Sequence, residues 1–203
     1  MRDEHAPFPR ARRDPAAGGS PPARIGGAPA SREGLTVEAV PIRPARRGDV
    51  PSLLMLWGAM LEENARLDPR LAVHPDAKEH MARTLLGWVE DSSRIVLVAE
   101  EGRHLVVGYA AGVIGPGGGF QGPARVAQVT DCFVVPPRRR KGIARRLVSR
   151  MHDLLFERGA ESVRLTVSAR NDASQAFWSS LGYEPLEEVL ERPAKNEGGG
   201  AAR

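Results

Sequence analysis

The stretch of sequence that decides the fold runs from Val134 to Leu147 and reads VVPPRRRKGIARRL. It holds six basic side chains around a single glycine, Gly142, and it joins a run of strand-forming residues to a run with helical spacing. The first main-chain N–H groups of a helix have no partner within the helix, and the helix dipole adds partial positive charge there. Glycine lets the main chain come close to a ligand. The stretch therefore predicts a site for a phosphate or a diphosphate.

A second interpretation of the same residues is a solvated basic face. Arg145 and Arg146 would lie on the polar side of an amphipathic helix, where they need no ligand. A general basic patch does not require a glycine at the first helical turn, a strand that leads into it, and a small residue, Ala144, beside it. These three features together favour a shaped phosphate site.

The bulk composition excludes several classes of protein. The chain has 203 residues and a formal net charge of only +4, which is modest for a dedicated nucleic-acid binder. Cys132 is the single cysteine, so no internal disulfide can form, and a reducing compartment suits it. No apolar run reaches the roughly 18 residues that span a bilayer, and no signal-peptide pattern follows the first charges. We expect a cytoplasmic protein that binds neither nucleic acid nor a membrane.

Both ends of the chain have the composition of segments that do not fold. Residues 1–34 are rich in Pro, Gly, Ala and Arg and have few large apolar side chains to offset the entropy of ordering. Their six arginines face four acidic residues, which is a weak basis for a nucleic-acid-binding arm. We therefore expect a disordered tail over 1–34, one folded domain over 35–192 and a flexible C-terminal tail over 193–203.

Between these tails, apolar residues alternate between period 2, which is typical of strands, and helical spacing. The pattern predicts strands at 37–42, 95–99, 105–114, 126–135 and 163–167, and a last strand at 183–190. It predicts helices at 51–65, with Asp49 as the N-cap, at 76–90, from 143 to about Arg158, and at 171–181. The sum is a mixed α/β domain.

Two motifs, in this order, resemble those of the GNAT superfamily of N-acetyltransferases. Arg139-x-x-Gly142-x-Ala144 is similar to the family's acyl-CoA pyrophosphate loop, in which Gln or Arg precedes the glycine by three positions. The downstream match consists of Asn171, Ala173, Ala176, Phe177, Leu181, Gly182 and Tyr183, with Ala173 one position from the commonest spacing. The resemblance implies the GNAT fold, a mixed and mostly antiparallel twisted sheet flanked by about four helices. It also implies an enzyme that transfers an acetyl group from acetyl-CoA to a primary amine of a small molecule or a protein N-terminus.

The resemblance also implies where the cofactor binds. The strand that ends at Val135 and the strand from Val163 would splay apart and admit the pantetheine arm of acetyl-CoA. The residues expected to contact the cofactor are Cys132, Phe133 and Val134 along the arm, Arg139, Arg140, Lys141, Gly142, Ile143 and Ala144 around the pyrophosphate, and Asn171 on the far side of the arm. Asn171 would serve equally well as the N-cap of the last helix, so both roles stay open.

The family's reaction is direct attack of an amine on the thioester, which needs a proton acceptor. The candidates are Asp131, in the strand beside the thioester, and Glu63 with its neighbour Glu62 at the end of the first helix. Asp131 could equally be a hydrogen-bonded structural residue, and the two glutamates could be a solvated helix face. Trp178 stands where many family members have a tyrosine that protonates the thiolate, and an indole N–H is not a useful acid at neutral pH. A CoA-binding module with little turnover therefore stays as the alternative.

Other signals indicate no further chemistry. The five histidines lack metal-ligand spacing, so no metal is expected. Gly117-x-Gly119-x-x-Gly122 matches a dinucleotide fingerprint in its letters, but Pro123 and a strand-like run follow it in place of a helix, so we expect a hairpin loop.

The acceptor amine is left open by the sequence. Its pocket is expected to involve Leu61 to Leu71, the loop at 115–123 and the final strand. Carboxylates at Glu62, Glu63 and Asp68 would suit a cationic amine, whereas Arg66 and Arg70 would oppose it. A homodimer is also left open.

Overall fold

The computed structural model describes residues 40–74, 76–102, 104–116 and 122–192. Several predicted segments lie outside the described residues. They are the expected tails at 1–34 and 193–203, residues 37–39 of the expected first strand, and residues 117–121 of the expected hairpin loop. The strands are β1 (Ile42–Pro44), β2 (Arg94–Glu101), β3 (Leu105–Pro116), β4 (Arg125–Val134) and β5 (Ser162–Arg164). The α-helices are α1 (Val50–Leu67), α2 (Ala77–Glu90), α3 (Ile143–Glu157) and α4 (Asp172–Ser179), with short 3₁₀ turns at Arg47–Asp49, Pro69–Leu71 and Pro136–Arg138.

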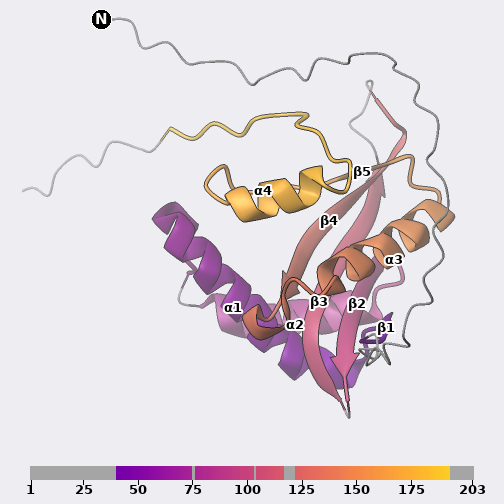
Figure 1. Ribbon diagram of the computed structural model, residues 1–203. Coiled ribbons are helices and arrows are strands. Elements are labelled where there is room, and N and C mark those ends of the chain that lie inside the picture. Colours follow the sequence, from indigo (N-terminus) through magenta and orange to yellow (C-terminus); the bar gives the residue numbers. More distant parts are fainter. Residues whose placement is uncertain (1–39, 75, 103, 117–121, 193–203) are drawn as a thin grey trace, which may run out of the picture. The chain divides into compact units, whose positions relative to one another are not determined.

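The strands form one sheet in the order β1-β2-β3-β4-β5 (Figure 1). All neighbours pair antiparallel except β4 and β5, which are parallel. The mixed, mostly antiparallel sheet with four α-helices that the sequence predicted is therefore confirmed.

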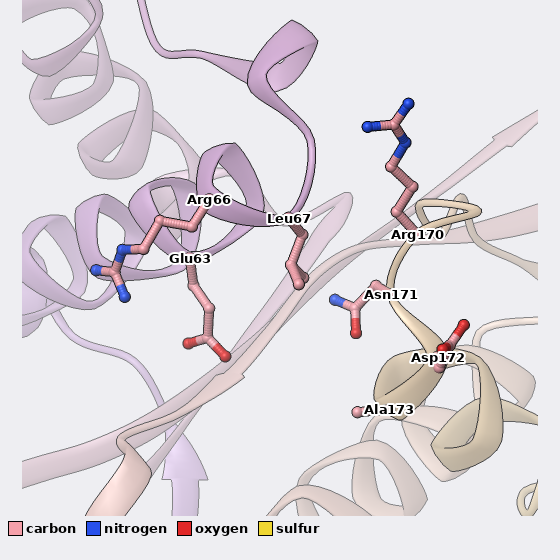
Figure 2. Close-up of a pocket in the computed structure, with 7 residues that line it drawn as sticks. All are labelled: Glu63, Arg66, Leu67, Arg170, Asn171, Asp172 and Ala173. Carbon is pink, nitrogen blue, oxygen red and sulfur yellow. The ribbon is translucent and has the colours of Figure 1, made fainter.

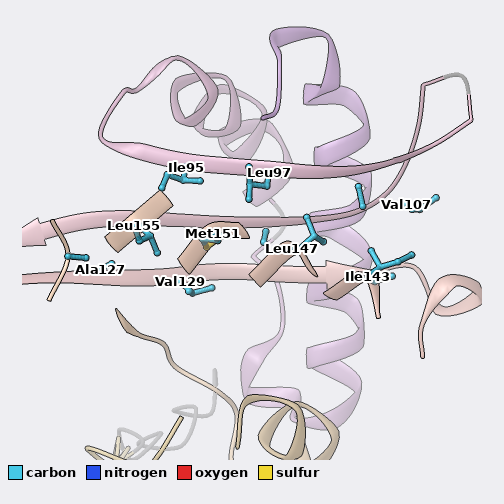
Figure 3. Close-up of a cluster of buried hydrophobic side chains, with 13 residues drawn as sticks. Ile95, Leu97, Val107, Ala127, Val129, Ile143, Leu147, Met151 and Leu155 are labelled. Carbon is cyan, nitrogen blue, oxygen red and sulfur yellow. The ribbon is translucent and has the colours of Figure 1, made fainter. Parts of the chain in front are cut away.

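Alternate side chains of β2 separate the core into two layers, because successive residues of a strand point to opposite faces. Ile95 and Leu97 pack with α3, whose buried stripe includes Leu147 and Met151 (Figure 3). On the other face, Val96 and Val98 pack with apolar side chains of α1 and α2, among them Leu53, Leu56, Trp57, Met81 and Leu85. The sheet is covered by helices on both faces, which explains why β2 reads as a continuous apolar run.

A β-bulge in β4 exchanges the faces to which its side chains point. Ala111 pairs with Asp131 and Gly112 with Val129, so Thr130 is the extra residue in β4. Val129 packs in the α3 layer, whereas Phe133 packs in the α1–α2 layer. Asp131 lies two residues before Phe133, so the two side chains point to the same face. The bulge therefore turns the Asp131 side chain away from α3.

The gap between β4 and β5 follows from the short length of β5. Only Val126 to Gln128 pair with β5, although β4 continues to Val134. The sequence predicted a strand over 163–167, but the ladder ends at Arg164. Within the described residues, the part of β4 that follows Gln128 therefore has no strand partner on the β5 side, as the resemblance implied.

Two local predictions were wrong. The run from Tyr183 to Leu190 forms no strand. Pro185 has no N–H to donate to a ladder, and the adjacent carboxylates of Glu187 and Glu188 keep the segment exposed. Asp49 stands at the N-cap position of α1, but its carboxylate does not cap that helix. It accepts instead from the main-chain N–H of Arg46 at 2.7 Å, in the 3₁₀ turn before α1.

Candidate functional site

The N-terminus of α3 is open to a ligand. Gly142 occupies the N-cap position in the left-handed region, with φ of 77°, and no side chain caps the helix. A Cβ at Gly142 would meet no atom within 4 Å, so the protein leaves open space directly beside this residue. The first bond of the helix runs from Arg146 N–H to the Gly142 carbonyl at 3.0 Å, which leaves the N–H groups of Ile143 to Arg145 without an intrahelical acceptor.

The residues before Gly142 shape the same concave main chain. Arg140 also lies in the left-handed region, with φ of 63°, which is uncommon for a side chain other than glycine. Alternation of left-handed and ordinary backbone turns successive N–H groups toward one point, as in anion-binding nests. Arg140 and Lys141 are exposed at its rim. Arg140 and Gly142 thus give the predicted phosphate loop two left-handed residues separated by one ordinary residue.

The free edge of β4 presents main-chain groups beside this loop. Val135 N–H donates to the Val107 carbonyl at 3.0 Å, and hydrogen-bonded pairs alternate along an antiparallel ladder. By this alternation, Cys132 and Val134 direct their N–H and C=O groups away from β3, into the gap beyond β4. Phe133 directs its own groups at Tyr109 in β3. Cys132 and Val134 can therefore hold a ligand through their main chain, whereas Phe133 cannot.

Arg139 is not free at the rim of the loop. Its two terminal nitrogens each donate to the carboxylate of Glu63 at 2.7 Å, and its Nε donates to the Val134 carbonyl at 2.8 Å. The guanidinium also lies over the Phe133 ring, with Cζ 5.2 Å from the centroid. Two residues that the sequence assigned to separate tasks, phosphate binding and proton transfer, thus neutralise each other in this structure.

The ion pair weakens Glu63 as a base. The hydrogen bonds from Arg139 lower the pKa of Glu63 from its ordinary value, and they raise the pKa of Arg139. Both side chains are 37% exposed. A pair with this exposure contributes only about 0.2 to 1 kcal/mol, so a stronger ligand can separate it.

A pocket of about 390 Å³ lies between the end of α1 and the start of α4. Glu63 and Leu67 project into it from α1, and Asn171 projects into it from the turn before α4 (Figure 2). Asn171 Oδ1 accepts from the main-chain N–H of Ser174 at 3.0 Å and so caps α4. Its amide nitrogen points toward α1 in Figure 2. The two roles left open for Asn171 are therefore compatible, because each uses a different atom.

Asp131 is buried, with 7% of the residue exposed, on the α1–α2 face of the sheet. The Tyr109 hydroxyl donates to its Oδ1 at 3.2 Å. Burial raises the pKa of Asp131, against the opposing effect of hydrogen bonds from Thr130 and Tyr109. A raised pKa suits a carboxylate that must take a proton near neutral pH, but Asp131 does not line the pocket at Glu63.

Comparison with known proteins decides the family. The model of the acetyltransferase (GNAT) family matches residues 57–183, which include both motifs and the pocket. The chain belongs to the GNAT family. No curated protein matches the sequence significantly.

Solved structures with the GNAT fold resemble this chain at low sequence identity. A mutant protein from Bacillus halodurans has a TM-score of 0.68 at 20% identity and covers 75% of this chain and 98% of its own. An aminoglycoside 6'-N-acetyltransferase from Acinetobacter haemolyticus has a TM-score of 0.61 at 17% identity, with coverage of 77% and 99%. An aminoglycoside N-acetyltransferase in complex with CoA has a TM-score of 0.58 at 20% identity, with coverage of 76% and 94%. At this identity the likeness establishes the fold.

Trp178, which stands where many GNAT proteins have a tyrosine acid, packs among other aromatic side chains. Trp178 packs edge-on against Tyr183, with ring centroids 5.3 Å apart. The Tyr183 hydroxyl lies 2.7 Å from His152 Nε2 of α3, and burial raises the pKa of Tyr183 to about 12. Burial also lowers the pKa of His152, which favours the neutral ring. Sequence reasoning missed this pair, because nothing local in the sequence connects two residues 31 positions apart.

The carboxylates expected to suit a cationic amine are all paired with arginines. Asp68 accepts from Arg70 at 2.6 Å and lies 3.5 Å from Arg170, and the hydrogen bonds from Arg70 lower its pKa to about 2. Glu62 lies 3.9 Å from Arg66. Within the part of the chain that the structure describes, no group of three or more potential metal ligands occurs. No helix among the same residues is long and apolar enough to cross a membrane.

Proposed function

We propose that this GNAT protein transfers an acetyl group from acetyl-CoA to a primary amine, on a small molecule or a protein N-terminus, by direct attack in a ternary complex. One observation carries the proposal. The uncapped N-terminus of α3, with Gly142 in the left-handed region, follows the part of β4 that has no partner on the β5 side. A diphosphate joined to an extended amide-containing arm is complementary to this pair of features.

The residues fit the two parts of the cofactor separately. The N–H groups that open α3, from Ile143 to Arg145, would hold the diphosphate together with Arg140 and Lys141. The main-chain groups of Cys132 and Val134 would pair with the amides of the pantetheine arm as a strand would. The amide nitrogen of Asn171 would donate to the arm from the other side.

The chemistry at the end of the arm needs a proton acceptor and a polarised thioester. The N–H groups of Cys132 and Val134, on the open edge of β4, are main-chain donors of which one could serve the thioester oxygen as charge develops. Asp131 and Glu63 are the two proposed proton acceptors. The departing thiolate needs no tyrosine, because a thiol with a pKa of about 8.5 is a fairly good leaving group and water can protonate it.

A CoA-binding module with little turnover is the second candidate, and a specific observation favours it. Glu63 is held by Arg139, and the Tyr183 hydroxyl faces His152. Release of free thiol from acetyl-CoA in the presence of a panel of primary amines, with mass detection of the acetylated product, separates the two functions. Saturable CoA binding without amine-dependent thiol release would favour the binding module. A cytoplasmic location and a homodimer are further proposals, to be tested by cell fractionation and light scattering.

Gly142→Glu should abolish acetyl-CoA binding, because it places a side chain and a negative charge where the diphosphate would lie. Gly102→Glu is the matched control. Gly102 also has a left-handed φ, of 60°, and open space around it, so the backbone strain and the charge are similar, but it lies in the β2–β3 turn. Isothermal titration with acetyl-CoA measures both. Unchanged affinity in a folded Gly142→Glu variant would refute this position for the diphosphate.

A further inference from the structure

Arg139 occupies two groups that the proposed reaction needs. Its Nε donates to the Val134 carbonyl, which is one of the free main-chain groups on the edge of β4. Its terminal nitrogens hold the Glu63 carboxylate, one of the two proposed proton acceptors. While Arg139 stays in this position, it takes one of the two acceptor sites of that carbonyl, and it weakens Glu63 as a proton acceptor.

A diphosphate at the start of α3 would compete for the same guanidinium. Arg139 lies three residues before Gly142, in the loop that leads to the uncapped helix. Arginine binds phosphate and carboxylate with the same paired geometry, and a diphosphate carries more charge than one carboxylate. The Arg139–Glu63 pair is partly exposed on both sides, so its exchange requires no opening of the core.

We propose that the diphosphate of CoA takes Arg139 from Glu63, and that the released Glu63 carboxylate then accepts the proton of the attacking amine. This inference rests on the proposed acetyl transfer. It makes CoA binding a condition for a competent base.

The geometry gives Glu63 a direct path to this role. Glu63 lines the pocket of about 390 Å³ from α1, and Asn171 lines it from the turn before α4 (Figure 2). In the step, the amine nitrogen forms a bond to the acyl carbon, and the carbon–sulfur bond breaks with its electron pair on sulfur. The proton from nitrogen goes to Glu63, which becomes a neutral acid. It returns this proton to solvent or to the CoA thiolate.

The charges around Glu63 fix the sign of a proton linkage. Arg139 lowers the pKa of Glu63 from the loop, and Arg66 lowers it from the same helix. Across the pocket lie Arg170 and Asp172, at the start of α4. Loss of Arg139 removes the largest of the lowering effects, so the pKa of Glu63 rises when CoA binds. CoA binding should therefore take up protons at a pH near the ordinary glutamate pKa, and its affinity should gain there as the pH falls.

Glu63→Gln in the full-length protein tests the exchange without any need for turnover. The neutral amide of the variant holds Arg139 less strongly, so the variant should bind CoA about threefold to fivefold more tightly than the wild type, as expected for loss of a partly exposed ion pair. Titration calorimetry at about pH 4.5, in two buffers with different ionisation enthalpies, should show proton uptake by the wild type in excess of that by the variant. The variant should also lose most of the amine-dependent thiol release.

Glu101→Gln is the matched control. Arg138 Nε donates to Glu101 at 2.6 Å, and these side chains are 34% and 36% exposed, so a neighbouring arginine of the same loop loses an equivalent partner. Glu101 ends β2 and does not line the pocket. This variant should keep the wild-type proton uptake and gain much less affinity than Glu63→Gln. If both variants gained the same affinity for CoA, the loss of one negative charge would explain the gain. This result would overturn the proposed exchange of Arg139 between Glu63 and the diphosphate.

Arg139→Gln provides an independent measurement. Without the guanidinium, the largest effect that lowers the pKa of Glu63 is already absent from the free protein, so the excess proton uptake should disappear while CoA binding weakens. Thermal unfolding of each variant confirms that it is folded. If the wild type binds no CoA, the proposed function fails. If the wild type binds CoA but Glu63→Gln binds it equally or more weakly, the exchange fails and Glu63 is a support that holds Arg139 in place.

Discussion

At the scale of single residues, Asn171 shows how one side chain can serve both the fold and a ligand. Its oxygen satisfies an N–H of the first turn of α4, at Ser174, which a cap must do. Its amide nitrogen is left to donate into the pocket. Capping alone would accept serine or aspartate equally well, so a serine variant can test whether the amide nitrogen has a role of its own.

Asn171→Ser should separate these two roles. The serine hydroxyl still caps α4, so the free energy of unfolding should stay within about 0.5 kcal/mol of the wild type. The donor to the pantetheine arm is lost, and the affinity for acetyl-CoA should fall by about tenfold, as for one hydrogen bond. Asn171→Ala should lose the same affinity and also about 1 kcal/mol of stability, measured by urea unfolding. Full affinity in the serine variant would leave Asn171 as a cap only.

At the scale of elements, the sequence predicted what is local and missed what joins distant segments. The apolar stripe of α3 and the cap at Asn171 are set by neighbours in the chain, and the structure contains both. The bulge at Thr130 and the Arg139–Glu63 pair join segments far apart, the latter across 76 residues. The spacing of apolar residues carries no information about such contacts, so the pairing of Arg139 with Glu63 could not be predicted from the motif alone.

The short strand β1 is held by the ion pairs of one arginine. Its Arg43 donates to Asp49 at 2.7 and 2.9 Å and also pairs with Glu100 of β2. Only 8% of Asp49 is exposed. Three strand residues make few ladder bonds, so this carboxylate holds the edge of the sheet to the turn before α1.

Asp49→Asn should destabilise the protein by about 1 to 3 kcal/mol at neutral pH, because Arg43 loses a charged partner in a mostly buried site. The hydrogen bonds from Arg43 lower the pKa of Asp49 in the folded state. The stabilisation is therefore present above the ordinary aspartate pKa and is lost as the pH falls through the lower, folded value. Urea midpoints measured from pH 6.5 down to pH 3 should show the difference between wild type and variant shrinking below about pH 4.

The exposed Glu79 supplies the control for this measurement. It makes only an i, i+4 contact with Arg83 and is 83% exposed. Glu79→Gln should change the free energy of unfolding by less than about 0.5 kcal/mol at every pH. A difference between wild type and Asp49→Asn that stays constant to pH 3 would contradict the assigned role of the carboxylate.

At the scale of the whole molecule, elements that pack on both faces of the sheet build the pocket. The phosphate loop and α4 approach β4 beyond its free edge, whereas α1 brings Glu63 from the helices of the other face. The bulge at Thr130 and the early end of β5 open β4 to both. The pocket therefore lies where elements from both faces meet, which is the position expected for a group transferred between two substrates.

The same organisation predicts that residues 1–37 contribute nothing to the cofactor site. Every residue assigned to the site lies in the described part of the chain, between positions 63 and 171. A protein that starts at Glu38 should keep its free energy of unfolding within about 0.5 kcal/mol. Its affinity for acetyl-CoA should also be unchanged at low and at high salt. Residues 1–34 carry six arginines, so a fall in affinity that appears only at low salt would instead show that they attract the diphosphate electrostatically.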